Sequence, residues 1–494
     1  MILNLTCPAA RRVRKQLTVA LGVFGLLASS ACEGGAEDFP HELRQESAAL
    51  VSCANAGSDE AFYSFTGTLP AKNGTLLKCE KLFSESDAGA PLTSRAYRVL
   101  YRTSTLVHTG GSVSELGLVA SGQIVVPTAA AIGPDGGVTD RPVIADTHGA
   151  TGVLPACGPS RTRTRDGTPS FLNKVMPGAV VVYPDYVGLG VDHKFRVPEA
   201  GYLVTWPNGV KSAPFSNITH PIVSIESEGR ATVDIVRAAR ELTTLPGKVK
   251  WITLGQSQGG HAAIATAEVV KRHYADELNL LGVVAGAPAS ELDKDAWWEP
   301  SLKNALFGMV AASLPLEWRD IKASRYLSDA AMMAISDVPN RICFGEDTLL
   351  ETLAKYGLVP DMWRVNPWQD PTTKAILGTM SPGREPVGVP MFVGTVRGDP
   401  FVAHQRTATF VAAARQKSPN LITFCEYNGP VPANQWPALS RGQNHNAFRE
   451  MFATQKVGEL TLPKPPHWGC TLDNSPIKAT DPVGFVEAVY KKSF

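Results

Sequence analysis

A short apolar run, Val249–Leu254, leads directly into the motif G-x-S-x-G at Gly255-Gln256-Ser257-Gln258-Gly259. A helical pattern then begins at Gly260–Ile264. This order of strand, tight turn and helix is typical of a nucleophile elbow, in which the turn carries a serine hydroxyl beyond the end of a sheet. Glycines on both sides of the serine avoid steric clashes in such a turn. The alternative is a purely structural glycine-rich turn. The strand–turn–helix context favours Ser257 as a nucleophile.

The patterns around this motif predict an α/β fold. From about Tyr97 onward, short apolar runs that end in Gly- or Asp-containing turns alternate with helical patterns, which favours a mostly parallel central sheet. A helix is expected over Arg230–Leu242, with Pro246-Gly247 as its stop. The expected strands are an antiparallel pair at Tyr97–Tyr101 and Gly122–Val126, followed by Val143–Ala145, Ala179–Tyr183, Val249–Leu254, Leu280–Ala285, Met391–Gly394 and Leu421–Phe424.

The alternation breaks over residues 290–386, where helical patterns are interrupted by prolines. An insertion of this length between two strands of a sheet is usually a cap over the site at the strand ends. Alternatively, its tryptophans build a small helical core of their own. We therefore expect a signal peptide at 1–31, an extension at 32–95, a catalytic core at 96–289 and 387–494, and a helical cap at 290–386.

The composition narrows the function classes. Hydrophobic residues make up 44% of the 494 residues and charged residues 19%, which excludes a disordered chain and a polytopic membrane protein. Lys and Arg number 47 against 46 Asp and Glu, a net charge of +1 without a basic stripe. Nucleic-acid binding is therefore not expected.

The N-terminus reads as a secretory signal peptide. A basic region that includes Arg11, Arg12, Arg14 and Lys15 precedes the apolar run Leu17–Leu27, which is too short to span a bilayer. Small residues then lead to Cys32, in a pattern that resembles a bacterial lipobox, although Ser29 stands where a large aliphatic residue is usual. We expect export, with Cys32 lipidated and anchored to a membrane. The alternative is simple cleavage and release.

Cleavage before Cys32, with that cysteine lipidated, leaves six other cysteines. An even number in an exported chain predicts disulfides. Neither C-x-x-C nor H-x-x-x-H occurs, so no metal site is expected. Cys53 and Cys79 flank a segment punctuated by Gly and Pro and are the preferred bridge. The other four permit three pairings, which stay open: Cys157, Cys343, Cys425 and Cys470.

A serine nucleophile requires a histidine base and an acid that orients the base. In this fold the acid follows the serine along the chain, and the histidine comes last. The strand pattern at Met391 runs into a Gly-containing loop that ends at Asp399, which predicts Asp399 as the acid. Glu346 and Asp347 fall inside the expected cap and are interpreted as solvated charges.

The predicted base is His445, in the polar, Gly-containing loop Gly442–Asn446 after the strand pattern at Leu421. His404 begins a helix directly after Asp399 and is interpreted as a surface residue. His467, near the end of the chain, is the main competitor for the role of base.

Two backbone N–H groups are expected to bind the oxyanion. One is that of Gln258, directly after the nucleophile, and the other comes from the loop after Val143–Ala145. In that loop His148-Gly149-Ala150 is a His-Gly turn followed by a small residue, which predicts Ala150 as the donor, with Gly149 nearly as suitable. His148 itself is interpreted as a residue that braces the loop.

These motifs resemble those of the secretory-lipase family of α/β-hydrolases, in its bacterial branch. The resemblance runs from about Tyr97 to His445 and implies a lipase or esterase with a helical lid, no cofactor and an ester or lipid substrate. The Asp185 loop is expected to shape the site entrance. The matching segments are His148–Gly152, Cys157–Ser160, Tyr183–Gly190, Glu226–Arg230 and Gly255–His261.

Two departures from the family pattern occur. Gly158 stands where alanine is expected, and the loop from Gly394 to Asp399 is two residues longer than usual. Two alternative functions also remain open. The triad does not distinguish an ester from an amide, so a serine peptidase or amidase of the same fold is one. The other is a surface binding protein without activity.

Overall fold

The structure is a computed structural model of the whole chain. It describes residues 53–82 except 56, 94–127, 143–162, 179–191, 204–205, 209–212, 219–243, 245, 249–274, 278–294, 300–337, 343, 361–399 and 401–427, together with Ile477, Phe485, Ala488 and Val489. All of them belong to one compact unit, Leu50–Phe494. The expected signal peptide and Cys32 lie outside the described residues.

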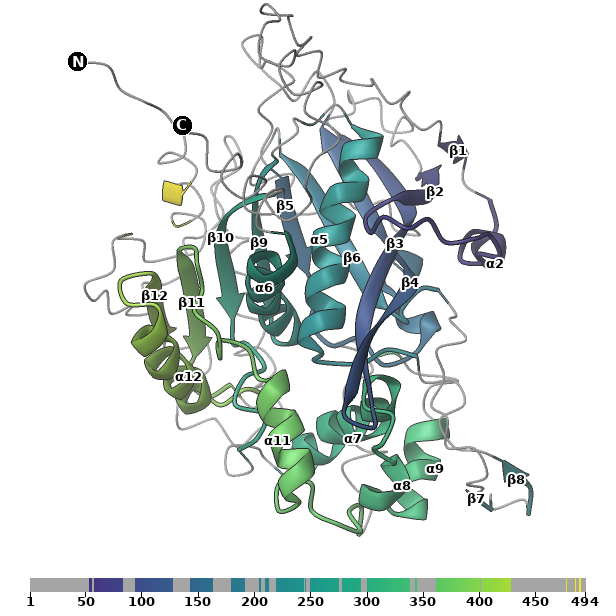
Figure 1. The fold of residues 1–494 in the computed structure, drawn as a ribbon, viewed down its shortest axis with the longest axis vertical. Helices are drawn as coiled ribbons and strands as arrows, with labels where there is room; N and C mark the ends of the chain where they lie inside the picture. The colour runs from purple at the N-terminus through teal and green to yellow at the C-terminus, as the bar shows by residue number, and fades with distance from the viewer. Residues whose placement is uncertain are drawn as a thin grey trace, which may run out of the picture. The chain divides into compact units, whose positions relative to one another are not determined.

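A ten-stranded sheet forms the centre of this unit, in the order β1-β2-β3-β4-β6-β5-β9-β10-β11-β12 (Figure 1). From β6 to β12 neighbouring strands run parallel, whereas β2, β3, β4 and β6 pair antiparallel. The predicted α/β-hydrolase fold with a mostly parallel sheet is confirmed. The strands are β1 (Ala54–Asn55), β2 (Leu76–Lys81), β3 (Ser94–Thr109), β4 (Ser112–Pro127), β5 (Val143–Thr147), β6 (Val180–Val187), β9 (Lys250–Gln256), β10 (Asn279–Gly286), β11 (Met391–Val396) and β12 (Ile422–Tyr427). A separate hairpin pairs β7 (Val204–Thr205) with β8 (Lys211–Ser212).

The antiparallel pair β3–β4 is much longer than the sequence pattern predicts. Its two 16-residue strands pair from Ser94 to Thr109, and the outer part extends to helices that follow β10. There the His108 ring stacks on Trp318 with a centroid distance of 3.7 Å, and the Arg319 N–H donates to the His108 carbonyl at 2.9 Å. The outer part of the hairpin therefore contacts a distant segment, which a local pattern does not show.

One group of helices covers one face of the sheet, and a second group lies beyond one end of it. α5 (Ile225–Leu242), α6 (Gln258–Val269) and α12 (His404–Lys417) pack on one face, where their apolar residues share a core with the strands (Figure 1). α5 begins five residues before the expected Arg230, because the Ser224 side chain caps it by accepting from the Ser227 N–H at 3.1 Å. Shorter turns are α2 (Asp59–Phe62), the 3-10 turn Pro155–Cys157, α3 (Pro159–Thr162) and the π-turn Val270–Tyr274.

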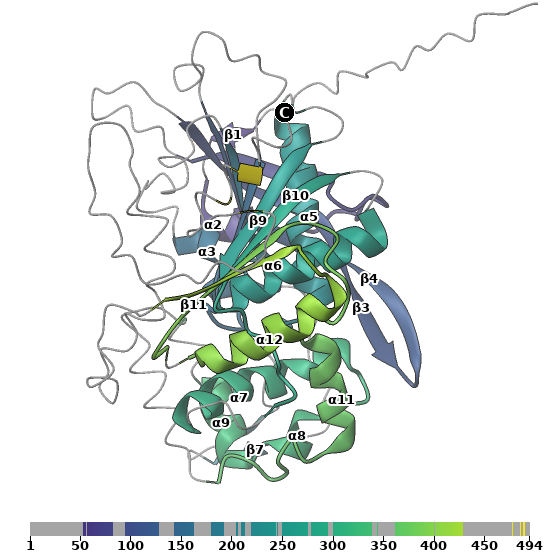
Figure 2. The same ribbon diagram turned by 90° about the vertical axis from the view of Figure 1, so that its left-hand side faces the viewer.

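The segment between β10 and β11, which we call the inserted segment, is helical as expected. Its helices α7 (Pro300–Glu317), α8 (Ala323–Tyr326), α9 (Asp329–Asp337) and α11 (Pro371–Met380) lie beyond one end of the sheet in both ribbon views (Figures 1 and 2). Trp368 packs edge-on against Phe307 at 4.6 Å and against Trp363 at 5.9 Å. Some of its tryptophans therefore build a helical core of their own. Trp297 and Trp298 lie outside the described residues.

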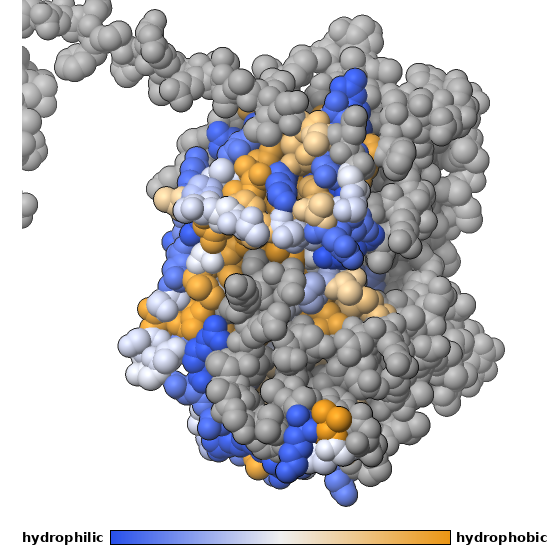
Figure 3. All heavy atoms as spheres, turned by 90° about the vertical axis from the view of Figure 1, so that its right-hand side faces the viewer, coloured by the Kyte–Doolittle hydropathy of each residue, from blue (hydrophilic) through white to orange (hydrophobic). Residues whose placement is uncertain are grey.

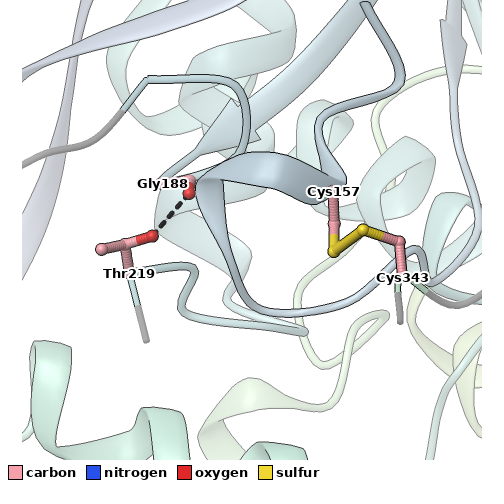
Figure 4. The surroundings of a disulfide bond; sticks show 4 residues. All are labelled: Cys157, Gly188, Thr219 and Cys343. Atoms are coloured by element: carbon pink, nitrogen blue, oxygen red, sulfur yellow. Dashed lines mark hydrogen bonds between the residues drawn. A yellow bond between two sulfur atoms is a disulfide. The ribbon is translucent and has the colours of Figure 1, made fainter. Parts of the chain in front are cut away.

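Two disulfides are present among the described residues. Cys53 and Cys79 are bonded, as expected, with their Cα atoms 4.9 Å apart. The second joins Cys157, in the turn after the His148 loop, to Cys343 in the inserted segment (Figure 4). Beside it the Thr219 hydroxyl donates to the Gly188 carbonyl at 2.6 Å. Cys425 is also disulfide-bonded, and its partner lies outside the described residues, as does Cys470.

Figure 3 shows one face of the molecule, on which apolar and hydrophilic residues are intermixed where the chain is described. The large apolar side chains that are exposed lie apart in the sequence, at Val113, Val210 and Val365. Within the described part of the chain, no helix combines the length and the apolarity that crossing a membrane requires.

A buried carboxyl group connects the inserted segment to the core. Glu317, the last residue of α7, accepts hydrogen bonds from the Thr105 hydroxyl of β3 and, at 2.8 Å, from the Ser224 hydroxyl that caps α5. Burial raises the pKa of Glu317 to about 7, although both hydroxyl groups act to lower it. The folded protein therefore keeps this carboxyl protonated at pH values where the unfolded chain has released the proton.

We expect Glu317→Gln to stabilise the protein above pH 7 and to have no such effect near pH 4. Protonated Glu317 contributes its full stability below the pKa that the residue has in the unfolded chain. As the pH rises from there to about 7, the free energy of unfolding falls by an amount on the order of 3 kcal/mol. Thermal unfolding of both proteins at pH 4 and pH 8 measures the difference. Asp320→Asn, at a nearby exposed carboxylate, is the control. Equal gains at both pH values would contradict the protonated state of Glu317.

Candidate active site

Ser257 occupies the turn between β9 and α6 in a backbone conformation that non-glycine residues rarely adopt, with φ 61° and ψ −123°. Three hydrogen bonds hold the turn. The Ser257 N–H donates to the Gly286 carbonyl of β10 at 2.8 Å. The Ser257 carbonyl accepts from the N–H groups of His261 at 3.0 Å and Ala289 at 3.1 Å. The neighbouring strand and the helix that follows therefore fix Ser257 in this strained conformation.

The glycines that flank Ser257 are required by close packing. A Cβ atom on Gly255 would lie 2.2 Å from the Thr147 hydroxyl, and one on Gly259 would lie 2.0 Å from the Thr147 carbonyl oxygen. Thr147 is the last residue of β5, and its hydroxyl donates to the carbonyls of Leu254 and Gly259, both at 2.7 Å. The turn is thus packed tightly against the end of the adjacent strand.

The loop after β5 lies beside Ser257. Parallel pairing aligns Thr147 with Gly255, and a Cβ atom on Gly149 would be 3.8 Å from the Cβ of Ser257. The buried His148 ring lies with Nδ1 2.6 Å from the Gly149 carbonyl and Nε2 3.2 Å from the Asp185 carbonyl. Tyr186 also donates to the His148 carbonyl at 2.9 Å. His148 therefore braces this loop, in agreement with its interpretation from the sequence.

The carboxylate of Asp185 is a structural group below this loop. It accepts from the Ser121 hydroxyl of β4 at 2.6 Å, from the Ser160 N–H of α3 at 2.8 Å, and from the Ser160 hydroxyl. Asp185 is almost fully buried. It joins three segments beneath the site, which supports a role in shaping the site rather than in the reaction.

Asp399 follows β11 at the same edge of the sheet. Its Oδ1 accepts from the N–H groups of Phe401 at 2.8 Å and Val402 at 3.0 Å, which orient the carboxylate. β11 pairs with β10, which in turn pairs with β9, so Asp399 and Ser257 follow strands separated by one neighbour. The loop before Asp399 is long because β11 continues through Val396, whose carbonyl accepts from the Asp399 N–H at 3.2 Å.

The predicted base, His445, lies outside the described residues, as do His467, Glu346 and Asp347. His404 is described and begins α12, as expected, but it is half-buried rather than a surface residue. Burial lowers the pKa of His404, an effect that the Glu426 and Asp399 carboxylates reduce and the Arg397 charge strengthens. Of the expected site residues that are described, Ser257, Asp399 and the loop that carries Gly149 all lie at one edge of the sheet.

A cluster of buried polar side chains behind the Ser257 turn was not identified from the sequence. Glu228 of α5 and His261 of α6 form an ion pair in which Nδ1 and Oε2 are 2.7 Å apart, and both residues are fully buried. Both residues lie in segments that match the secretory-lipase resemblance, Glu226–Arg230 and Gly255–His261. The periodicity of the sequence does not show that these two segments contact each other. Elsewhere too, the described residues contain no group of three or more His, Cys, Asp or Glu that could hold a metal ion.

Comparison with protein families supports the resemblance seen in the sequence. The model of the secretory-lipase family matches residues 170–315, which include the Ser257 turn. Over these residues the chain is similar to the secretory lipases. It is therefore a carboxylic-ester hydrolase of the α/β-hydrolase fold. A sequence comparison with curated proteins found no match.

Several solved structures similar to this protein have the same fold. A ligand-bound form of the rice cell wall degrading esterase LipA from Xanthomonas oryzae has a TM-score of 0.56 at 19% identity, covering 77% of this chain and 97% of that one. Candida antarctica lipase A in its closed state has a TM-score of 0.52 at 16% identity, covering 89% and 95%. A putative hydrolase from Legionella pneumophila has a TM-score of 0.51 at 18% identity, covering 77% and 99%.

Proposed function

We propose that the protein is an exported enzyme that cleaves carboxylic esters through an acyl-enzyme on Ser257, with Asp399 and His445 completing the triad. The observation that carries this proposal is the strained backbone of Ser257 at the junction of β9 and α6, beside the Gly149 loop. In a nucleophile elbow this strained conformation presents the serine hydroxyl in front of a helix N-terminus.

The proposed reaction has two steps. His445 removes the proton from the Ser257 hydroxyl as Oγ attacks the ester carbonyl, and the imidazolium then gives that proton to the leaving alcohol. Water hydrolyses the acyl-enzyme by the same route, with His445 again as base. Asp399 orients His445 and stabilises its charged form. Its own orientation by two backbone N–H groups suits this task.

The N–H groups of Gln258 and Ala150 are proposed to bind the oxyanion of each tetrahedral intermediate. Gln258 is the first residue of α6, so its N–H has no partner within the helix, and the helix dipole favours negative charge at this end. Ala150 belongs to the loop whose Gly149 lies beside Ser257. Donors held in advance at the developing charge are worth about 3 kcal/mol each in related chemistry.

Turnover of a p-nitrophenyl ester, compared with that of an aminoacyl anilide, tests the proposed reaction. We expect rapid release of nitrophenol and little cleavage of the anilide. Preferential cleavage of the anilide would identify a serine peptidase of the same fold. Absence of both activities in folded protein would contradict catalysis and favour a binding protein.

The inserted segment is proposed to be a cap that selects the acyl chain. Leu306 of α7 is half-buried against Ala287, Phe401 and Val402. Ala287 directly follows Gly286, whose carbonyl binds the Ser257 N–H. An apolar side chain of the inserted segment therefore lies close to the nucleophile turn and to the loop that carries Asp399.

We expect Leu306→Ser to lower kcat/KM for an octanoate ester by about 10-fold, and that for an acetate ester much less, because only the longer chain loses apolar contact. Initial rates with a series of p-nitrophenyl esters measure the difference. Val365→Ser, at an exposed position of the same segment, is the control. Equal losses for both esters in folded Leu306→Ser would show that the segment does not select the acyl chain.

Export with lipidation of Cys32 is the remaining part of the proposal. We expect the mature protein to separate with the membrane fraction, because several acyl chains anchor a protein firmly, whereas a single acyl chain anchors it only marginally. The variant Cys32→Ala should be released or mislocalised. Fractionation and intact-mass measurement test this. An unmodified mature N-terminus would reject lipidation and leave simple secretion.

A further inference from the structure

The carboxylate of Glu228 uses both of its oxygens on groups that surround the nucleophile turn. Oε1 accepts from the Val223 N–H at 2.8 Å and from the Gln258 side-chain amide at 2.7 Å. Oε2 is 2.7 Å from Nδ1 of His261. All three partners are at least nine-tenths buried, so water cannot replace the carboxylate. Glu228 thus connects α5 with two residues of the first turn of α6.

The Gln258 side chain is fixed by this connection. Its Nε2 also lies 2.8 Å from Nε2 of His220, whose Nδ1 is 2.8 Å from the Val187 carbonyl. Burial lowers the pKa of His220 despite the nearby Glu228 charge, so its ring is neutral and accepts at Nε2. Gln258 therefore donates both amide hydrogens to buried acceptors. It cannot change position without losing two hydrogen bonds.

His261 extends the connection to the inserted segment. Its Nε2 lies 2.9 Å from the carbonyl oxygen of Met380, the last residue of α11. Both ring nitrogens therefore face acceptors, as in a charged imidazolium. Burial by itself lowers the pKa of His261, but the Glu228 charge and the hydrogen bonds to Glu228 and Met380 together raise it above the usual value. A cation at the C-terminal end of a helix is also favourable.

We propose that Glu228 is a positioning residue for the oxyanion hole, holding Gln258 directly and the end of α11 through His261. This inference rests on the proposed function, in which the Gln258 N–H binds the oxyanion. The backbone of Gln258 adjoins the strained Ser257, and its side chain is anchored by Glu228 and His220. Because the same carboxylate also binds His261, the oxyanion donor and the last helix of the inserted segment are fixed to one group.

Loss of Glu228 should therefore reduce the rate at each active site rather than only the number of folded sites. Displacement of a catalytic group by about 1 Å can cost about 100-fold in rate. A merely structural role would lower the melting temperature and the fraction of competent enzyme. It would not change kcat when the rate is divided by the number of active sites that react with a fluorophosphonate.

The experiment compares Glu228→Met with Glu228→Gln in the full chain, using p-nitrophenyl acetate and titrated active sites. We expect Glu228→Met to lower kcat per site about 100-fold, with KM changed by less than about threefold. Glu228→Gln should retain activity to within about fivefold, because its oxygen can still accept from Val223 and Gln258 while its amide donates to a neutral His261. Glu226→Gln, two residues away on α5, is the matched control and should be unchanged.

A second variant keeps the test decisive if Glu228→Met does not fold. Gln258→Met removes the amide but leaves the backbone N–H, and we expect a comparable loss of kcat per site. The double variant with Glu228→Met should lose less than about twofold more kcat per site than either single variant, because both changes break the same connection. Wild-type kcat per site in either single variant, or fully multiplicative losses in the double variant, would overturn the inference. An inactive, unlabelled wild-type protein would instead refute the proposed function.

Discussion

Replacement of Ser257 by alanine is expected to abolish ester hydrolysis, with a loss on the order of a million-fold in kcat. The acyl-enzyme cannot form without the Ser257 oxygen, and the proposed base and acid assist this attack but cannot replace it. Hydrolysis of p-nitrophenyl acetate by purified protein measures the loss. The turn should stay intact, because its hydrogen bonds use only the backbone of Ser257.

Ser290→Ala is a suitable control for this experiment. Ser290 directly follows Ala289, whose N–H binds the Ser257 carbonyl, and its buried hydroxyl has no hydrogen-bond partner within the described part of the chain. It should therefore retain wild-type activity. More than about 1% residual activity in folded Ser257→Ala would assign the chemistry to another residue.

Asp399→Asn is expected to lower kcat by about 10⁴-fold while leaving the fold unchanged. The amide oxygen of asparagine can still accept from the Phe401 and Val402 N–H groups, so the loop keeps its conformation. The amide cannot stabilise an imidazolium, and it favours the wrong tautomer of the base. Steady-state rates together with circular dichroism separate loss of catalysis from loss of structure.

His445→Ala should cause a loss of similar size, and the double variant should be little worse than either single one, because the two residues act as a unit. His404→Ala and Asp347→Asn, at the alternative positions along the chain, should remain active. A large loss in His404→Ala with an active His445→Ala would transfer the role of base to the residue that begins α12.

The strand–turn–helix geometry at Ser257 was predictable because its signals are local. Gly255 and Gly259 are needed within a few residues of Ser257, where a Cβ atom would collide with Thr147. The strands β5, β6, β9, β10, β11 and β12 were predictable for a similar reason. Strands buried on both faces consist of continuous apolar runs, which stand out between polar turns.

The features that the sequence did not show depend on residues far apart in the chain. The outer half of the β3–β4 hairpin contacts a segment far along the chain, where His108 packs on Trp318. Cys157 could have paired with any of three cysteines, and its bond to Cys343 follows from where the inserted segment lies. The Glu228 connection likewise joins α5, α6 and the end of α11, so no single helix pattern contains it.

The most direct test of the proposed active site is to find where an activated phosphonate reacts. The intact protein is treated with a fluorophosphonate, its mass is measured, and the adduct is located by fragmentation of the labelled peptide. We expect one adduct per chain, on Ser257, formed in parallel with loss of esterase activity. An adduct on another residue, or full inactivation without labelling of Ser257, would contradict catalysis at this turn.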